Sequence, residues 1–111
     1  MSEIRIRQPE ARTLEVAALL AAYGPLTRQD LYSDHKVSQR QIKIGLNDGR
    51  ALGWVKMTRG GTGPWNFSVT AEGLAALARW ESPSWEVSDL GDSYAVRRYT
   101  GGAWELVRTV P

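Results

Sequence analysis

The sequence predicts one α+β folded unit: three helices, a β-hairpin, a fourth helix and then a second β-hairpin. Apolar residues recur at three- to four-residue spacing over the first half of the chain, as on the buried face of a helix. Two later segments alternate apolar and polar residues around glycine-rich turns. The length of 111 residues is typical of one domain. We expect residues 1–81 to form the main domain with an N-terminal arm, and residues 82–111 to pack on it as a β-hairpin extension.

The N-terminal segment predicts a mostly buried first helix. Residues 1–7 alternate briefly between apolar and charged residues, which indicates either a short strand or a flexible basic arm. Pro9 suits the first turn of a helix, and the apolar residues from Glu10 to Tyr23 form a wide stripe. Gly24 and Pro25 are expected to end this helix, because proline cannot continue it.

Two helix-start signatures follow, 11 residues apart. Thr27 and Ser38 can each accept a hydrogen bond from a free N–H group in the first helical turn. Three residues later, Asp30 or Gln41 can reach back to the N–H of the cap residue. Gln41 completes the usual capping box, whereas Asp30 is a shorter variant. Apolar residues bracket both caps, as a hydrophobic staple requires: Leu26 with Leu31, and Val37 with Ile42.

These signatures predict a second helix over 28–33 and a third over 39–51. Gly45 conflicts with the third, because glycine costs about 1 kcal/mol in a helix interior. Either the helix ends near Asn47, or Gly45 lies where a neighbouring backbone packs closely. We expect the helix to continue to about Ala51, with Gly53 as its stop.

The second half of the chain predicts two hairpins around a fourth helix. Strands are expected at 54–59 and 65–69 around a glycine-rich tip, and Thr70 is the expected N-cap of the fourth helix. The segment 82–84 breaks that helix, and strands at 94–99 and 103–108 flank a Thr-Gly-Gly turn.

Five tryptophans are many for this length. We expect Trp54, Trp65 and Trp80 to be core residues around the first hairpin and the fourth helix. Trp85 and Trp104 either pack against the first helix or cover a partner.

The composition disfavours several classes of protein. Absence of cysteine excludes disulfides and thiolate metal sites, and one histidine, His35, leaves little room for zinc or for serine–histidine catalysis. We therefore expect no catalytic residues, no metal site and no cofactor, and do not expect an enzyme. The glycines at 60–63 lack the Gly-Lys-Ser/Thr of a phosphate-binding loop. No apolar stretch is long enough to cross a bilayer, and no signal segment opens the chain, so a cytoplasmic protein is expected.

Positive charge is concentrated on the paired helices. The net charge is +2, but residues 27–59 hold seven Lys and Arg against three Asp, a local charge of +4. Residues 60–111 carry −2. The third helix adds side chains that can read base edges: Gln39, Arg40, Gln41, Lys43 and Asn47. Two capped helices joined by a tight turn are typical of a helix-turn-helix, so the sequence predicts DNA binding.

Residues 11–80 resemble the winged helix-turn-helix superfamily, particularly small bacterial and phage transcriptional regulators. The resemblance is carried by the element order and by two motifs. A capped recognition helix runs into Ala51-Leu52-Gly53-Trp54, and the hairpin returns into a threonine-capped helix at Val69-Thr70-Ala71-Glu72-Gly73-Leu74. The match covers about two-thirds of the chain, and residues 81–111 match no family that we can name.

The resemblance implies that the helix from Ser38 enters the major groove with its first turns against base edges. Thr27, Arg28, Ser38 and the N-terminal amides of the helices would lie against phosphates. The hairpin with Lys56 and Arg59 would form a wing on the adjacent minor groove or backbone. The expected DNA-binding residues are Thr27, Arg28, Lys36, Ser38, Gln39, Arg40, Gln41, Lys43, Asn47, Lys56, Arg59, Gly60, Gly61 and Thr62.

The leading functional hypothesis is a sequence-specific regulator of transcription, a repressor that binds a palindromic double-stranded DNA site as a homodimer. The alternative is a winged helix used for protein contact, with the aromatic C-terminal hairpin as the binding face. Salt separates the two, because phosphate contacts weaken steeply with salt and an aromatic interface barely responds.

Overall fold

The computed structural model describes residues 8–111, so the expected strand or arm at residues 1–7 lies outside the described residues. Residues 8–111 form an α+β fold with four helices and two antiparallel sheets. The helices are α1 (Gln8–Tyr23), α2 (Arg28–Ser33), α3 (Gln39–Ala51) and α4 (Ala71–Ala78). The strands are β1 (Val55–Thr58), β2 (Asn66–Val69), β3 (Trp85–Asp89), β4 (Tyr94–Thr100) and β5 (Ala103–Val110).

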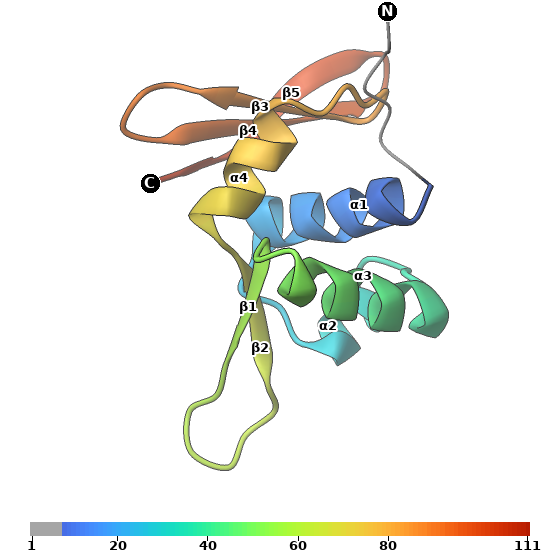
Figure 1. Cartoon of the computed structure of the whole chain (residues 1–111). Coiled ribbons are helices and arrows are strands. Elements are labelled where there is room, and N and C mark those ends of the chain that lie inside the picture. Colours follow the sequence, from blue (N-terminus) through green and yellow to red (C-terminus); the bar gives the residue numbers. More distant parts are fainter. Residues whose placement is uncertain (1–7) are drawn as a thin grey trace, which may run out of the picture.

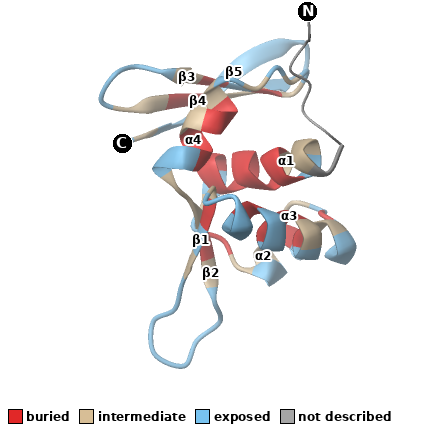
Figure 2. Cartoon of the chain, in the orientation of Figure 1, coloured by how far each residue is buried: buried red, intermediate tan, exposed pale blue. Residues whose placement is uncertain are grey.

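Helix α1 is the central element of the fold. In Figure 1 it lies between α2 and α3 on one side and the β3–β4–β5 sheet on the other, while the β1–β2 hairpin projects away from the body. Its side chains from Val16 to Ala22 are all buried, and burial is concentrated along α1 in Figure 2. No helix among residues 8–111 is long and apolar enough to span a bilayer.

The expected bounds of α2 and α3 are confirmed, and so is the cap of α2, but the capping box of α3 is incomplete. The Thr27 hydroxyl accepts from the Asp30 N–H, and the Asp30 carboxylate accepts from the Thr27 N–H, both at 3.0 Å. At α3 only one half of the box forms, in which the Ser38 hydroxyl accepts from the Gln41 N–H at 3.2 Å. The prediction that Gln41 would complete the box is therefore wrong. Gln41 instead lies at the side of α3 nearest α1, where it lines a shallow pocket with Arg12 and Ile44.

Helix α3 continues through Gly45, as expected. The absence of a side chain at this position lets α3 pack closely on α1. A Cβ atom at Gly45 would lie 2.5 Å from Val16 Cγ2, so the close neighbour is a side chain of α1 rather than backbone. One turn later, Gly49 is buried, and a Cβ atom there would lie 2.7 Å from Val55 Cγ2 of β1. Tight packing of α1 on α3 offsets the cost of glycine in the helix.

The C-terminal extension is a three-stranded antiparallel sheet rather than the expected two-stranded hairpin. The additional strand, β3, pairs with β4 so that Trp85 faces Arg98 and Val87 faces Val96. The β4–β5 pairing contains the predicted glycine turn and a bulge beside Val96 and Arg97. The alternation of buried Trp85 and Val87 with Glu86 and Ser88 is the signal that identifies this strand in the sequence.

The sheet is attached to α1 by polar contacts around Trp85, which is 3% exposed. Its indole N–H donates to the Glu15 carboxylate at 3.3 Å. The Arg98 guanidinium lies over the Trp85 ring, 4.7 Å from its centroid, and donates to the Tyr23 hydroxyl at 3.0 Å. Trp85 therefore packs against the first helix, which was one of its two expected roles.

The environment of Glu15 makes stability depend on pH. Burial raises the pKa of this carboxyl above its ordinary 4.5, although the Trp85 hydrogen bond and the Arg98 charge both act in the opposite direction. The folded state therefore holds this proton more tightly than the unfolded chain. The contribution of Glu15 to the free energy of unfolding falls as the pH rises from about 4.5 through the folded pKa.

We expect Glu15→Gln to gain stability relative to the parent chain as the pH rises from about 4 to 7. Glutamine keeps an oxygen to accept from Trp85 and does not ionise. Denaturant unfolding of both chains across this range measures the difference, with Glu81→Gln, an exposed carboxyl, as control. A difference between Glu15→Gln and the parent that does not change with pH would contradict the assignment.

Candidate nucleic-acid interface

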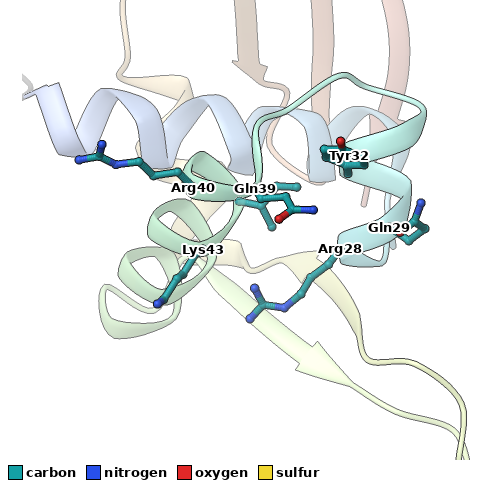
Figure 3. Close-up of a pocket in the computed structure, with 7 residues that line it drawn as sticks. Arg28, Gln29, Tyr32, Gln39, Arg40 and Lys43 are labelled. Atoms are coloured by element: carbon teal, nitrogen blue, oxygen red, sulfur yellow. The ribbon is translucent and has the colours of Figure 1, made fainter.

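A groove with a volume of about 510 Å³ separates α2 from α3. Figure 3 shows Arg28 of α2 and Lys43 of α3 extending toward the same side of this groove, with Gln39 between the two helices. The stem of Arg40 lines the groove, and the rest of its side chain points away from it. The structure therefore gathers several of the expected DNA-binding residues around one concave surface.

The exposed face of α3 carries most of the residues expected to read bases. Ile42, Gly45, Leu46 and Gly49 are buried, so the helix presents its opposite face to solvent. Gln39, Arg40, Lys43 and Asn47 are all exposed on that face. Gln41 does not belong to it, because it is half-buried at the side of α3 nearest α1.

Arg12 of α1 joins the interface, although it is not among the residues expected from the sequence to bind DNA. It is exposed and lines a shallow pocket of about 310 Å³ together with Ser38, Arg40, Gln41 and Ile44. Because α1 packs along α3, this cation is added beside the first turn of α3. Its distance in sequence from the helix pair explains why no local pattern identified it.

The two capping hydroxyls are engaged by their own helices. Thr27 and Ser38 each accept a backbone N–H of the following turn. The Asp30 carboxylate in the first turn of α2 disfavours a phosphate at that helix end. The first turn of α3 contains no acidic residue, so its positive end is the more favourable of the two for an anion.

Lys36 turns back onto its own loop. Its backbone has φ 58°, in the left-handed region, and its ammonium donates to the Ser33 carbonyl at 2.9 Å. This hydrogen bond satisfies a free carbonyl at the C-terminal end of α2 and places a positive charge beside it. In the same loop, the His35 ring stacks on Tyr23 with 4.8 Å between ring centroids.

The two cations of the β1–β2 hairpin lie on opposite faces. Lys56 pairs with Ser68, and the next residue, Met57, pairs with Phe67. The side chains of these two pairs therefore point to opposite faces of the hairpin. The Arg59 guanidinium lies over the Trp65 ring, 5.3 Å from its centroid. Trp65 is two residues from Phe67, so this contact lies on the same face of the hairpin as Phe67. The hairpin tip beyond them is exposed: Gly60, Gly61 and Thr62.

Trp65 is 44% exposed, so the prediction that it belongs to the core is wrong. Phe67, two residues later on the same face, is 1% exposed and occupies the last buried position of the hairpin. Trp54 and Trp80 do pack against the core, as expected.

The β3–β4–β5 sheet presents a second surface on the far side of α1. Tyr99 and Trp104 form an edge-to-face pair with ring centroids 5.3 Å apart, and both are exposed together with Leu106. Arg97 lies on the same face, 3.9 Å from the Glu86 carboxylate. We call Tyr99, Trp104 and Leu106 the aromatic patch.

The described residues thus offer a basic, polar surface on α2, α3 and the first hairpin, and an aromatic patch on the C-terminal sheet. No group of three or more potential metal-binding side chains occurs among residues 8–111. The basic surface has the chemistry that an anionic polymer requires, namely arginine and lysine beside amide side chains. No protein-family model matches the chain, and no curated protein or solved structure matches it either.

Proposed function

We propose that this protein is a sequence-specific double-stranded DNA-binding regulator of the winged helix-turn-helix type. The observation that carries the proposal is the exposed face of α3, with Gln39, Arg40 and Lys43, beside a groove that shares Arg28 with α2. An α-helix fits the major groove, where each base pair presents a distinct set of donors and acceptors. Positive charge concentrated on residues 27–59 favours the approach of this face to DNA.

Each side chain has a distinct role in this proposal. Arg40 can bond a guanine through two N–H groups, and Gln39 can bond an adenine in the same manner. Lys43, Arg28 and Arg12 contact phosphates on either side of α3. The β1–β2 hairpin is the wing, with Arg59 and the tip 60–62 against the backbone or minor groove.

A homodimer on a palindromic site fits this proposal. Two copies related by a two-fold axis would place two α3 helices in successive major grooves, with half-sites about 34–36 Å apart. Selected DNA sites with inverted symmetry, and a complex of two chains per duplex, would support this arrangement. A single chain per asymmetric site would contradict it.

We expect Arg40→Ala to bind a selected duplex about 10- to 100-fold more weakly and to relax discrimination at one base pair. Lys43→Ala is expected to weaken all duplexes similarly and to lower the salt slope of log affinity by about 1. Fluorescence anisotropy with labelled duplexes at several salt concentrations measures both effects. Arg97→Ala, on the β3–β4–β5 sheet, is the matched control. Binding that survives Arg40→Ala with its base preference intact would contradict the role given to α3.

The aromatic patch supports a second candidate function, protein contact through the C-terminal sheet. Its three apolar side chains are exposed on a surface that the proposed DNA contact does not use. A protein complex held by this patch would be lost in Trp104→Ala and would change little between about 50 and 200 mM salt. Absence of duplex binding at the lower salt concentration would favour this second candidate over the regulator.

A further inference from the structure

The exposed Trp65 ring has a specific setting at the base of the hairpin tip. Arg59 covers part of the indole through its guanidinium, which also donates to the Thr62 carbonyl at 3.5 Å. The rest of the ring is open, since 44% of the residue is exposed to solvent. An indole in this position is not needed for the core, because Phe67 already fills the buried position beside it.

The ring borders a groove that leads to α2. This groove has a volume of about 350 Å³ and is lined by Thr27, Arg28, Gln29, Pro64, Trp65 and Phe67. Its lining contains one cation and no acid. The Arg28 guanidinium lies over the Phe67 ring, 5.4 Å from its centroid. The Trp65 ring therefore contacts the Arg59 guanidinium and borders the groove that Arg28 lines.

An apolar ring with guanidinium groups around it and its groove matches the chemistry of one strand of a DNA backbone. Along that strand, phosphates alternate with deoxyribose rings, whose C–H edges are apolar. In a duplex the bases are stacked on one another, so deoxyribose is the apolar surface that the backbone offers to a protein. Guanidinium groups pair with phosphates through two N–H groups, and an indole buries apolar C–H surface.

We propose that Trp65, Arg28 and Arg59 form a binding site for the deoxyribose–phosphate backbone of duplex DNA. Trp65 packs on the C1′–C2′ edge of one deoxyribose, while Arg28 and Arg59 pair with the phosphates that flank it. The site rests on the proposed function and adds to it a contact that recognises the sugar. A ribose in this position would bury its 2′-hydroxyl against the indole without a hydrogen-bond partner, which is unfavourable.

The first test compares Trp65→Ala with Trp65→Phe and with Trp104→Ala. Trp104 is a matched control because it is 41% exposed and lies on the C-terminal sheet. We expect Trp65→Ala to bind duplex DNA about tenfold more weakly with an unchanged salt slope, because no charge is lost. Trp65→Phe is expected to retain most of the affinity, and Trp104→Ala all of it. Arg59→Ala is expected to lower the salt slope by about 1.

The second test identifies the sugar. Single deoxynucleotides of the duplex are replaced by ribonucleotides, one position at a time, and affinity is measured for the parent chain and for Trp65→Ala. We expect the parent to lose affinity at one backbone position per protomer and Trp65→Ala to show no such position.

Four outcomes overturn a part of this account. Equal affinity of Trp65→Ala and the parent chain for duplex DNA overturns the site and leaves the proposed function standing. No position-sensitive loss in the ribonucleotide series overturns the sugar contact. Tighter binding of the single strand than of the duplex, abolished by Trp65→Ala, shows stacking on a base and overturns it too. No binding of duplex by the parent at any salt concentration overturns the proposed function itself.

Discussion

Phe67→Ala is expected to lower the free energy of unfolding by about 3–5 kcal/mol, the usual cost of removing a fully buried phenylalanine side chain. The ring is 1% exposed, and its backbone forms the bridge that attaches β2 to the segment before α2. The Phe67 N–H donates to the Leu26 carbonyl at 2.8 Å, and the Leu26 N–H donates to the Phe67 carbonyl at 3.0 Å. Losing the ring leaves a cavity where the hairpin meets the helices.

Chemical denaturation followed by circular dichroism measures this loss. Such a loss is a large share of the stability of a domain this size, so Phe67→Leu is a second variant, expected to cost about 1 kcal/mol. Met57→Ala is the control, because Met57 pairs with Phe67 in the ladder but is only half-buried. A loss below about 1 kcal/mol for Phe67→Ala would show that the hairpin does not depend on this ring for its attachment.

Gly73→Ala is expected to destabilise the fold by about 2 kcal/mol through overpacking, although alanine is the better helix former by about 1 kcal/mol. A Cβ atom at this position would lie 2.7 Å from Val69 Cγ2 and closer still to the Trp54 carbonyl oxygen. That oxygen accepts the Thr70 N–H at 2.8 Å, and the Thr70 hydroxyl caps α4 by accepting the Gly73 N–H at 3.0 Å. The new methyl group therefore pushes against a backbone carbonyl that is already engaged in the hydrogen bond to Thr70.

Gly60→Ala is the matched control for this substitution. Gly60 has open space around the position of a Cβ atom, and its backbone does not lie in the left-handed region. Alanine there is expected to be neutral or slightly stabilising, because it reduces the freedom of the unfolded chain. Thermal unfolding of both variants gives the comparison, and equal midpoints for Gly73→Ala and the parent chain would refute the packing argument.

The helix pair could be predicted from the sequence because its signals are local. Capping residues, staples and apolar spacing gave the bounds of α2 and α3 without knowledge of the rest of the fold. The sequence could not show that the reciprocal half of the Ser38 box is missing, because the pocket that Gln41 shares with Arg12 is created by the packing of α1. Arg12 could not be assigned to the interface from the sequence for the same reason.

In the two hairpin regions, the local sequence pattern does not predict every strand or every buried residue. Trp65 and Phe67 alternate onto one face, and nothing in that pattern says which of the two is the last to reach the core. Strand β3 is not predicted because it follows a serine- and proline-containing break, although its alternation is regular. The separation of Lys56 from Arg59 is a matter of strand parity and could have been read from the sequence.

The position of α1 has a consequence for how this chain can be engineered or recombined. On one side of α1, Val16 packs against Gly45 of α3. On the other side, Glu15 accepts a hydrogen bond from Trp85 of the C-terminal sheet. Adjacent residues of a single helix thus serve the two halves of the protein at once. A chimera that exchanges only the helix-turn-helix, or only the sheet, inherits a helix whose other flank is mismatched. Donor segments for grafting must therefore be chosen with α1 and both of its neighbours as one unit.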